Sequence, residues 1–458
     1  MPGPIGFCRL KVTGLLATRL GCVSAFLFLL VNDALVSGVE IAPTSTSAAG
    51  STRNASVPES SLRASVSKGT AAISSVHPLG SSLATTTFES LDQSVQIDSD
   101  FCGGRLNECF EITPTRFQLV VRPERKPINN SAWYAFRIRS HTPKSIKVHL
   151  SYQGGTHRYT PRISNDGVVW RDGQHLVSSV HPSGCEVVLQ MDVGPDVLWV
   201  SAQELISNAD TERWTDELAM LPHVTRSVCG TSVQGRPISK LVIGDPQAES
   251  PGYVFIMGRL HPPETTGAIG LMRFAESIAA DSELTEQFRR SFHVVVVPNA
   301  NPDGVELGRW RCNANSVDLN RDWGLFRQPE TRVLRQELLD LKTRGRESLY
   351  LVLDFHSTYE DVFYLTEDVD DAFPKNFTAT WLNRFDQRLP SYEVNLDKTH
   401  NSKRTTSKAW VDRVLNVAAV TYEFGDNTDR DEIARLSQIS AEEMMRTLLS
   451  YRERDRSF

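Results

Sequence analysis

Two patterns of apolar and polar positions divide the chain beyond residue 100. From Phe101 to about Ala202, short runs rich in β-branched and aromatic residues alternate with turn sequences such as Gly154-Gly155. Runs of this length and spacing predict a small all-β sandwich over residues 101–205. The predicted strands are Phe117–Val121, Trp133–Ile138, Ser145–Ser151, Val168–Trp170, Glu186–Met191 and Val197–Val200.

From about residue 206 the apolar runs alternate with amphipathic helical segments, which predicts an α/β domain with a largely parallel or mixed sheet over residues 206–455. In such sheets ligands bind beyond the carboxyl ends of the strands. The predicted strands are Lys240–Ile243, Tyr253–Leu260, Phe292–Val297, Leu349–Phe355 and Ala418–Phe424. The predicted helices are Glu264–Ala280, Glu330–Arg344 and Asp431–Tyr451.

The first hundred residues show a different composition. Basic residues precede the apolar run Cys22–Val31, and small residues follow it, an order typical of a secretory signal peptide over residues 1–38. Residues 39–100 are rich in Ser, Thr and Ala and predict a disordered linker. These features predict a protein that is secreted or lies in the endomembrane lumen, with no stable membrane insertion after signal removal. A single-pass membrane anchor is the alternative.

Composition limits the remaining function classes. The net charge is −6 with 23% charged residues, and no basic stripe with interleaved aromatic residues occurs, so no nucleic-acid partner is expected. Cys102 and Cys109 bracket a short glycine-containing loop that a disulfide could close.

Polar side chains follow four of the predicted strands. His261 and Glu264 follow one strand, the segment Asn301–Gly304 follows the next, and His356 and Glu423 close two others. Because strand ends of one sheet share an edge, these groups are expected to meet in one crevice. Two imidazoles and a carboxylate form the ligand set of a catalytic zinc, and Glu423 could then act as general base.

The motifs around these residues resemble those of the zinc metallocarboxypeptidases. The sequence reads HPPE at 261–264, NPDGVELGRWRCN at 301–313 and VDLNRDW at 317–323. It is most similar to the cytosolic carboxypeptidase branch, whose amino-terminal β-domain the region before residue 206 also resembles. The resemblance implies a mixed-sheet metallocarboxypeptidase-like catalytic domain behind the β-sandwich. It also implies hydrolysis of C-terminal peptide bonds of peptides or protein tails by metal-activated water.

The resemblance also implies individual roles. One zinc ion per chain would be held by His261, Glu264 and His356. Asp318 would accept a hydrogen bond from His261. In the substrate complex, the expected contacts are Glu423 with the attacking water, Arg311 with the scissile carbonyl, and Asn320 and Arg321 with the terminal carboxylate.

Some features depart from the family pattern. Pro263 stands where pancreatic-type members of the family have an arginine and cytosolic-type members usually a glycine, so an accessory substrate contact is absent. The residues after Glu423 differ from those of both types. Lys408 or Arg413 could line the specificity pocket and favour an acidic terminal residue. Two other functions stay open at this point: an amidohydrolase or deacylase acting on small N-acyl amino acids, and a catalytically silent binding module.

Overall fold

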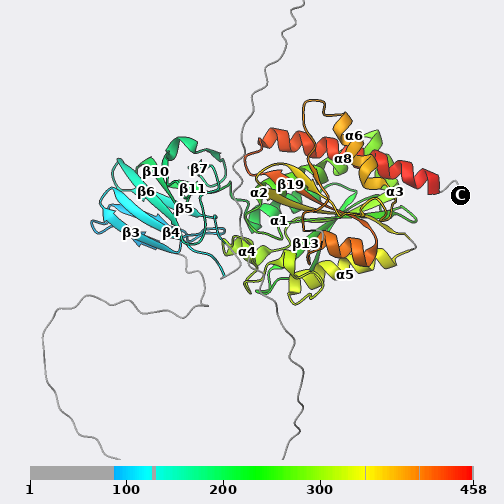
Figure 1. The fold of residues 1–458 in the computed structure, drawn as a ribbon, viewed down its shortest axis with the longest axis horizontal. Helices are drawn as coiled ribbons and strands as arrows, with labels where there is room; N and C mark the ends of the chain where they lie inside the picture. Colours follow the sequence, from blue (N-terminus) through cyan, green and yellow to red (C-terminus); the bar gives the residue numbers. More distant parts are fainter. Residues whose placement is uncertain (1–86, 126–129, 346, 402, 456–458) are drawn as a thin grey trace, which may run out of the picture. The chain divides into compact units, whose positions relative to one another are not determined.

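The structure is a computed structural model of the 458-residue chain, and it describes residues 87–125, 130–345, 347–401 and 403–455. The described residues belong to one compact unit. The predicted signal peptide lies outside the described residues, as does most of the predicted linker. Figure 1 shows a β-rich region that precedes a region of alternating strands and helices.

Two sheets form the β-rich region. The six-stranded sheet has the order β1-β2-β5-β11-β7-β8, and the five-stranded sheet has the order β3-β4-β6-β10-β9. All pairs are antiparallel except β4 with β6. The strands are β1 (Thr87–Glu89), β2 (Val95–Asp98), β3 (Glu108–Thr113), β4 (Arg116–Val121), β5 (Ala135–Ser140), β6 (Lys144–Tyr152), β7 (Arg162–Ser164), β8 (Arg171–Asp172), β9 (Val177–Val180), β10 (Glu186–Val193) and β11 (Leu198–Ser201).

Alternation along these strands builds one shared core. In β6, Ile146, Val148 and Leu150 are fully buried, while the residues between them are more exposed. Successive side chains of a strand point to opposite faces of its sheet. The alternation therefore gives each sheet one apolar face, and the apolar faces of the two sheets pack together. The core also contains Tyr159, from the segment before β7, which is 2% exposed.

The second region contains an eight-stranded mixed sheet with the order β12-β13-β15-β14-β16-β19-β17-β18. Its centre is parallel: β14 pairs with β15 and β16, and β16 pairs with β19. The carboxyl ends of these four central strands therefore lie at one edge. The strands are β12 (Val224–Thr231), β13 (Pro237–Ile243), β14 (Gly252–Gly258), β15 (Phe292–Val297), β16 (Leu349–Thr358), β17 (Val362–Tyr364), β18 (Leu396–Asp397) and β19 (Ala418–Gly425).

Helices cover both faces of this sheet, with α2 and α8 on one face and α5 on the other (Figure 1). The central strands are largely apolar because both faces are covered: Val254 and Ile256 enter one core, whereas Phe255 and Met257 enter the other. The helices are α1 (Asn208–Leu218), α2 (Thr265–Ala279), α3 (Glu283–Ser291), α4 (Pro302–Glu306), α5 (Pro329–Thr343), α6 (Phe377–Gln387), α7 (Ser407–Trp410) and α8 (Arg430–Asp455).

The fold class predicted from the sequence is confirmed, and two local predictions were wrong. Val168–Trp170 forms no strand, since Asp166 accepts hydrogen bonds from the N–H groups of Val168 and Val169 in a turn. The linker predicted to reach residue 100 ends earlier, because Val95 and Ile97 of β2 are buried in the sandwich core. Cys102 and Cys109 are free.

Candidate active site

A stiff turn between β14 and α2 carries the first two candidate metal ligands. Arg259 has a φ of 56° and is 4% exposed, and its guanidinium donates to the carbonyl oxygen of Pro262. The two prolines after His261 prevent a helix through the turn, so α2 begins directly after Glu264. The turn therefore fixes His261 and Glu264 at the carboxyl edge of the sheet.

Three donor groups converge at this edge. Glu264 Oε1 lies 2.7 Å from His261 Nδ1, and Glu264 Oε2 lies 2.6 Å from His356 Nδ1. Among the described residues, these three form a group whose donor atoms all lie within 4.8 Å of one another. Two imidazole nitrogens and one carboxylate are a donor set that suits zinc, and the remaining position would be open to water or substrate. The residues present therefore fit the metal that the sequence predicts.

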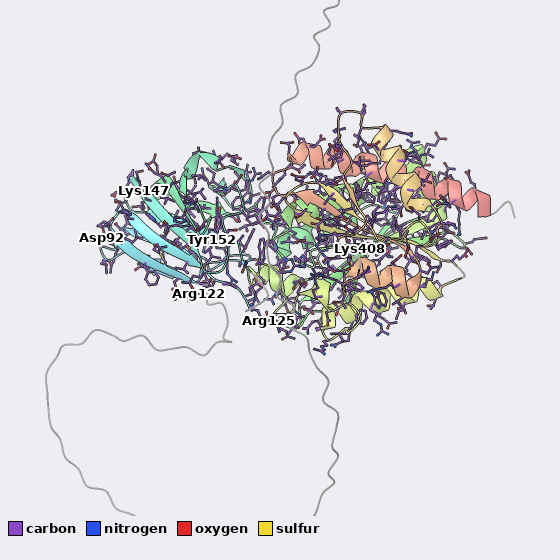
Figure 2. The ribbon with its side chains drawn as sticks, viewed as in Figure 1. Asp92, Arg122, Arg125, Lys147, Tyr152 and Lys408 are labelled. Atoms are coloured by element: carbon purple, nitrogen blue, oxygen red, sulfur yellow. The ribbon has the colours of Figure 1, made fainter. Side chains whose placement is uncertain are left out.

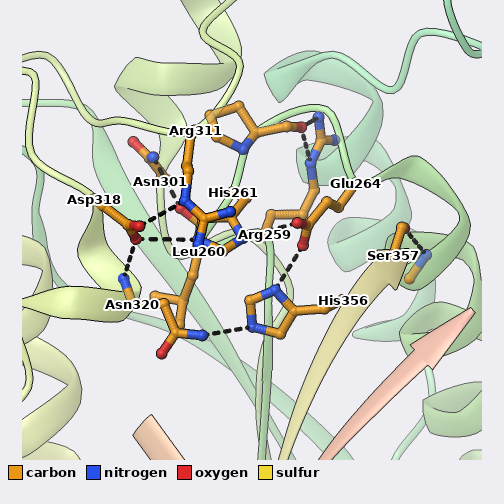
Figure 3. A network of polar contacts seen from close by, with 12 residues as sticks. Arg259, Leu260, His261, Glu264, Asn301, Arg311, Asp318, Asn320, His356 and Ser357 are labelled. Carbon is orange, nitrogen blue, oxygen red and sulfur yellow. Dashed lines mark hydrogen bonds and ion pairs between the residues drawn. The ribbon is translucent and has the colours of Figure 1, made fainter. Parts of the chain in front are cut away.

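Asp318 links this group to Arg311 and to the backbone N–H of Asn320 (Figure 3). Its Oδ1 lies 3.1 Å from His261 Nε2, and its Oδ2 accepts a 2.6 Å hydrogen bond from Arg311 Nε. Burial alone would raise the pKa of Asp318, but His261 and Arg311 outweigh burial and hold that pKa well below its usual range. Asp318 is therefore ionised at neutral pH, and it orients His261 with Nδ1 facing Glu264.

Asp318→Asn is expected to weaken zinc binding by about 10- to 100-fold, because the amide no longer fixes the orientation and basicity of His261. Competition with a zinc chelator measures the change. Asp340→Asn is the matched control, since Asp340 lies on the exposed face of α5 and its side chain bonds only to Gln336 among the described residues. Equal zinc affinity in wild type and Asp318→Asn would contradict the assigned contact.

His356 has a second carboxylate neighbour that the sequence analysis missed. His356 Nε2 lies 3.0 Å from Asp354 Oδ2, and Asp354 also accepts a hydrogen bond from Ser407 Oγ. Asp354 and His356 are two residues apart on β16, so they share one face of the sheet. This period-two spacing was available in the sequence. Asp354 therefore holds His356 from the side opposite Glu264.

Glu423 lies beside these residues because β19 is parallel to β16. His356 and Glu423 are direct partners in the register of the two strands, and both line one cleft. Burial raises the pKa of Glu423 to about 7. A carboxylate with this pKa can take a proton and return it near neutral pH.

The predicted substrate-binding residues line the same cleft. Asn320 is fixed on both sides: its Oδ1 accepts a 3.0 Å bond from Ser407 N, and its Nδ2 lies 3.3 Å from His356 Nε2. Arg321 donates through Nη1 to the carbonyl of Asn320 at 2.7 Å. Arg311 donates to Asp318 through Nε. Its two terminal nitrogens take no part in that bond.

The Asn301–Gly304 turn has a structural position. Asp303 is fully buried and accepts hydrogen bonds from Ser232 Oγ, Gln234 N and Arg236 Nη1. It thus anchors the β12–β13 connection, and it is not among the residues that line the cleft. The motif therefore serves as scaffold and does not join the other strand-end groups in the cleft.

A residue of the β-rich region supports Arg311, and the sequence analysis missed it. The carboxylate of Glu124 accepts hydrogen bonds from the backbone N–H groups of Trp310, Arg311 (3.3 Å) and Cys312 (3.0 Å). The guanidinium groups of Arg105 and Arg309 lie close enough to lower its pKa, although burial raises that pKa more strongly. No local sequence signal marks this glutamate, because its partners lie about 190 residues away.

The cleft has a volume of about 320 Å³ and combines residues of both regions. Arg158 and Tyr159 come from the segment before β7, whereas the candidate metal ligands and Glu423 come from the mixed sheet. A third group, after β17, adds cations and a histidine to the lining; its members are His400, Arg404 and Lys408.

Lys408, which Figure 2 labels, is buried, whereas Arg404 is exposed. Lys408 is 3% exposed, and its Nζ donates to the carbonyls of Leu365 (2.6 Å) and His400 (2.8 Å). Arg413 was the other candidate for the specificity pocket. It instead donates to the carbonyls of Ala409 and Arg404 and does not line the cleft.

Residues 211–444 match the family described as zinc carboxypeptidase, which is more than half of the chain. The chain belongs to the zinc carboxypeptidase family. Its members are metallocarboxypeptidase hydrolases that depend on zinc. The family predicted from the sequence motifs is thereby confirmed.

Several curated relatives in this family are cytosolic carboxypeptidases. Human cytosolic carboxypeptidase 6 is 30% identical over 139 residues, which cover 29% of this chain and 28% of the relative. Cytosolic carboxypeptidase 2 of Danio rerio is 25% identical over 391 residues, which cover 74% of this chain and 52% of the relative. The chain thus spans about half, or less, of the length of these relatives.

Solved structures share the fold. A metallo-carboxypeptidase from Burkholderia cenocepacia superposes with a TM-score of 0.65 at 18% identity, covering 78% of this chain and 100% of that chain. A metallo-carboxypeptidase from Pseudomonas aeruginosa gives a TM-score of 0.60 at 21% identity, covering 76% and 98%. The covered shares exceed the 206–455 segment alone, so the likeness includes part of the β-sandwich.

The relatives correct one group of predictions. The signal peptide and the secreted or endomembrane-lumen location were wrong, because these relatives are named cytosolic carboxypeptidases. The apolar run behind that prediction, and behind its alternative of a single-pass anchor, lies outside the described residues. Within the described part of the chain, no helix has the length and apolar character needed to cross a membrane.

Proposed function

We propose that this protein is a zinc-dependent carboxypeptidase that hydrolyses the last peptide bond of peptides or protein tails. One observation carries the proposal: the candidate zinc ligands share a single cleft with a carboxylate base and with arginines suited to a terminal carboxylate. These groups come from segments between residues 261 and 423, so only the fold brings them together. The family membership supports the same activity.

Each side chain has a role in the proposed reaction. Arg321 and the amide of Asn320 bind the terminal carboxylate, since a guanidinium can donate two parallel hydrogen bonds to one planar anion. Glu423 accepts a proton from the attacking water and returns it to the leaving amine. Arg311 donates to the oxygen of the scissile carbonyl as negative charge develops there, a contribution of about 3 kcal/mol for one well-placed donor.

Zinc would be held by Nδ1 of His261, Nδ1 of His356 and the carboxylate of Glu264, and when bound it would polarise the scissile carbonyl and acidify a water. Asp318 and Asp354 orient the two imidazoles in advance. The cleft is therefore arranged before substrate binds, and this preorganisation lowers the cost of reaching the transition state.

We further propose that the enzyme favours acidic terminal residues. Arg321, Arg404, Lys408 and His400 line one part of the cleft together. A carboxylate side chain placed there would be attracted by Arg321, Arg404 and Lys408, and the attraction is strengthened by the partial exclusion of water. A basic terminal side chain would be repelled by the same groups.

Zinc content and terminal amino-acid release test the proposed function together. The full chain is purified, its zinc is quantified, and release is measured from peptides ending in Glu, Lys or Phe. About one zinc per chain with release of Glu in preference to Lys is the expected result. Zinc without release from any peptide, but with hydrolysis of N-acyl amino acids, would instead favour a deacylase.

The acidic preference is expected to fall as the pH rises through 8. Burial lowers the pKa of Lys408 to about 8, although Asp397, Glu423 and Asp412 oppose this shift. Lys408 is therefore charged below pH 8 and neutral above it. The ratio of kcat/KM for peptides ending in Glu over those ending in Gln should drop by up to about tenfold between pH 7 and pH 9.

Lys408→Met should show the low ratio at both pH values. Lys403→Met is the control, because Lys403 is exposed and does not line the cleft. A wild-type ratio that stays constant between pH 7 and pH 9 would assign the preference to groups other than Lys408.

A further inference from the structure

A guanidinium from the β-sandwich reaches the catalytic cleft. Arg158 lies in the segment between β6 and β7, and it lines the same cleft as Glu264 and Glu423. Its side chain is 15% exposed. The reaction described above assigns it no role, although its chemistry is that of a strong hydrogen-bond donor.

Arg158 is held in place from several sides. Its Nε donates a 2.6 Å hydrogen bond to Asp426 Oδ2, and the Asp426 side chain is 4% exposed. Its guanidinium carbon lies 5.1 Å from the ring of Tyr159, 5.3 Å from that of Trp310 and 4.5 Å from that of Tyr359. These contacts fix the guanidinium plane and use only Nε among its nitrogens.

Asp426 is itself anchored from the sandwich. Its backbone carbonyl accepts a 2.9 Å hydrogen bond from Gln203, and the nearby Arg430 pairs with Glu204 at 2.5 Å. Gln203 and Glu204 follow β11 of the sandwich. The segment Gly425–Arg430 thus connects the two regions beside the cleft and keeps Arg158 at its wall.

The position of Arg158 relative to the other arginines indicates what it can bind. Arg321 contacts Asn320 and Thr405, whereas Arg158 contacts Tyr159, Trp310 and Asp426, so the two arginines share no partner. Trp310 immediately precedes Arg311, which we assign to the scissile carbonyl. A peptide whose terminal carboxylate lies at Arg321 would therefore pass Arg311 and continue toward Arg158.

The charge balance indicates the chemistry of the bound group. Burial raises the pKa of Asp426 to about 6, so the carboxylate is ionised at neutral pH and already balances the charge of Arg158. Among the described residues, the terminal nitrogens of Arg158 have no hydrogen-bond acceptor. A neutral acceptor such as a peptide carbonyl suits these donors better than a further anion does.

We propose that Arg158 donates to the main-chain carbonyl that precedes the scissile carbonyl of the substrate, so that the β-sandwich supplies a specificity-determining residue to the catalytic cleft. This inference rests on the proposed function for the orientation of the peptide. It assigns to the sandwich a direct contact with substrate.

Substrates of graded length test the contact. An N-acyl amino acid contains only the scissile carbonyl, whereas an N-acyl dipeptide with the same terminal residue adds the preceding one. Wild-type kcat/KM should rise about tenfold between the two, as for a hydrogen bond made by a charged donor. An alkene in place of the preceding amide should abolish the gain at constant length.

Arg158→Gln should remove this gain, and Arg158→Lys should restore part of it. Arg137→Gln is the matched control, because Arg137 also pairs with an aspartate, Asp98, and lies over two aromatic rings, but it does not line the cleft. It should lower the thermal unfolding midpoint and leave the gain unchanged. A gain that persists in Arg158→Gln, or that is absent from wild type, overturns the proposal.

Binding separates this proposal from the proposed function. In the Glu423→Gln background, dissociation constants for the same substrate pair should differ about tenfold with Arg158 present and become equal in Arg158→Gln. If binding depends on Arg158 but the wild-type protein releases no terminal amino acid, the carboxypeptidase activity is refuted and the Arg158 contact stands. If the protein with Arg158 binds both substrates equally and the wild type turns substrate over, the Arg158 contact is refuted and the carboxypeptidase activity stands.

Discussion

Glu423→Gln is expected to lower kcat by about 10²- to 10⁴-fold while the protein keeps its fold and its zinc. The amide has nearly the same size as the carboxylate but cannot accept a proton from water. Glu423 lies beside His356 in the strand register, and burial raises its pKa to about 7, the range in which proton transfer in both directions is efficient. Steady-state release of the terminal amino acid, with zinc quantified in the same sample, measures the effect.

The control for this substitution is Glu442→Gln on α8. Glu442 pairs with Arg388 at 2.6 Å on the surface, and its loss should leave kcat within about twofold of wild type. If Glu423→Gln retains more than a tenth of wild-type kcat with full zinc content, another group must act as the base.

Glu124→Ala is expected to lower the free energy of unfolding by about 3 kcal/mol and to reduce activity beyond that loss of stability. The substitution removes the acceptor for three backbone N–H groups at residues 310–312 and a counterion for Arg105 and Arg309. Without that acceptor the backbone that carries Arg311 loses its fixed position. Urea unfolding and kcat/KM of the folded protein give the two readouts.

Glu108→Ala provides the comparison for Glu124→Ala. Glu108 pairs with Arg122 at 2.6 Å, but both side chains are partly exposed, so its removal should cost at most about 1 kcal/mol. A similar small loss for Glu124→Ala, with unchanged kcat/KM, would show that the β-sandwich does not support Arg311.

Local sequence determined the central strands and the main helices. β15 was predicted with its observed bounds, and α2 and α5 within one residue at each end, because their apolar periods are strong and their ends carry clear signals. The helix α1 was missed. Its sequence is mostly polar, and its position depends on a capping box at Ser207 and on packing against β13.

The sequence predicted those parts of the candidate site that belong to motifs or to strand ends. His261, Glu264, His356 and Glu423 lie at or near the ends of strands that prove to be neighbours in one sheet, so a rule about strand ends was sufficient. Asp354 was overlooked even though its two-residue spacing from His356 places it on the same face of β16.

The sequence by itself determined the fold class, the family and the predicted metal-binding set, because these depend on local periodicity and on short motifs. Only the tertiary structure placed Glu124 against residues 310–312 and Arg158 in the cleft. Both residues act across more than 150 positions of chain and belong to no motif. Their partners are chosen by the packing of the sandwich against the catalytic region, and a pattern along the chain does not encode such long-range contacts.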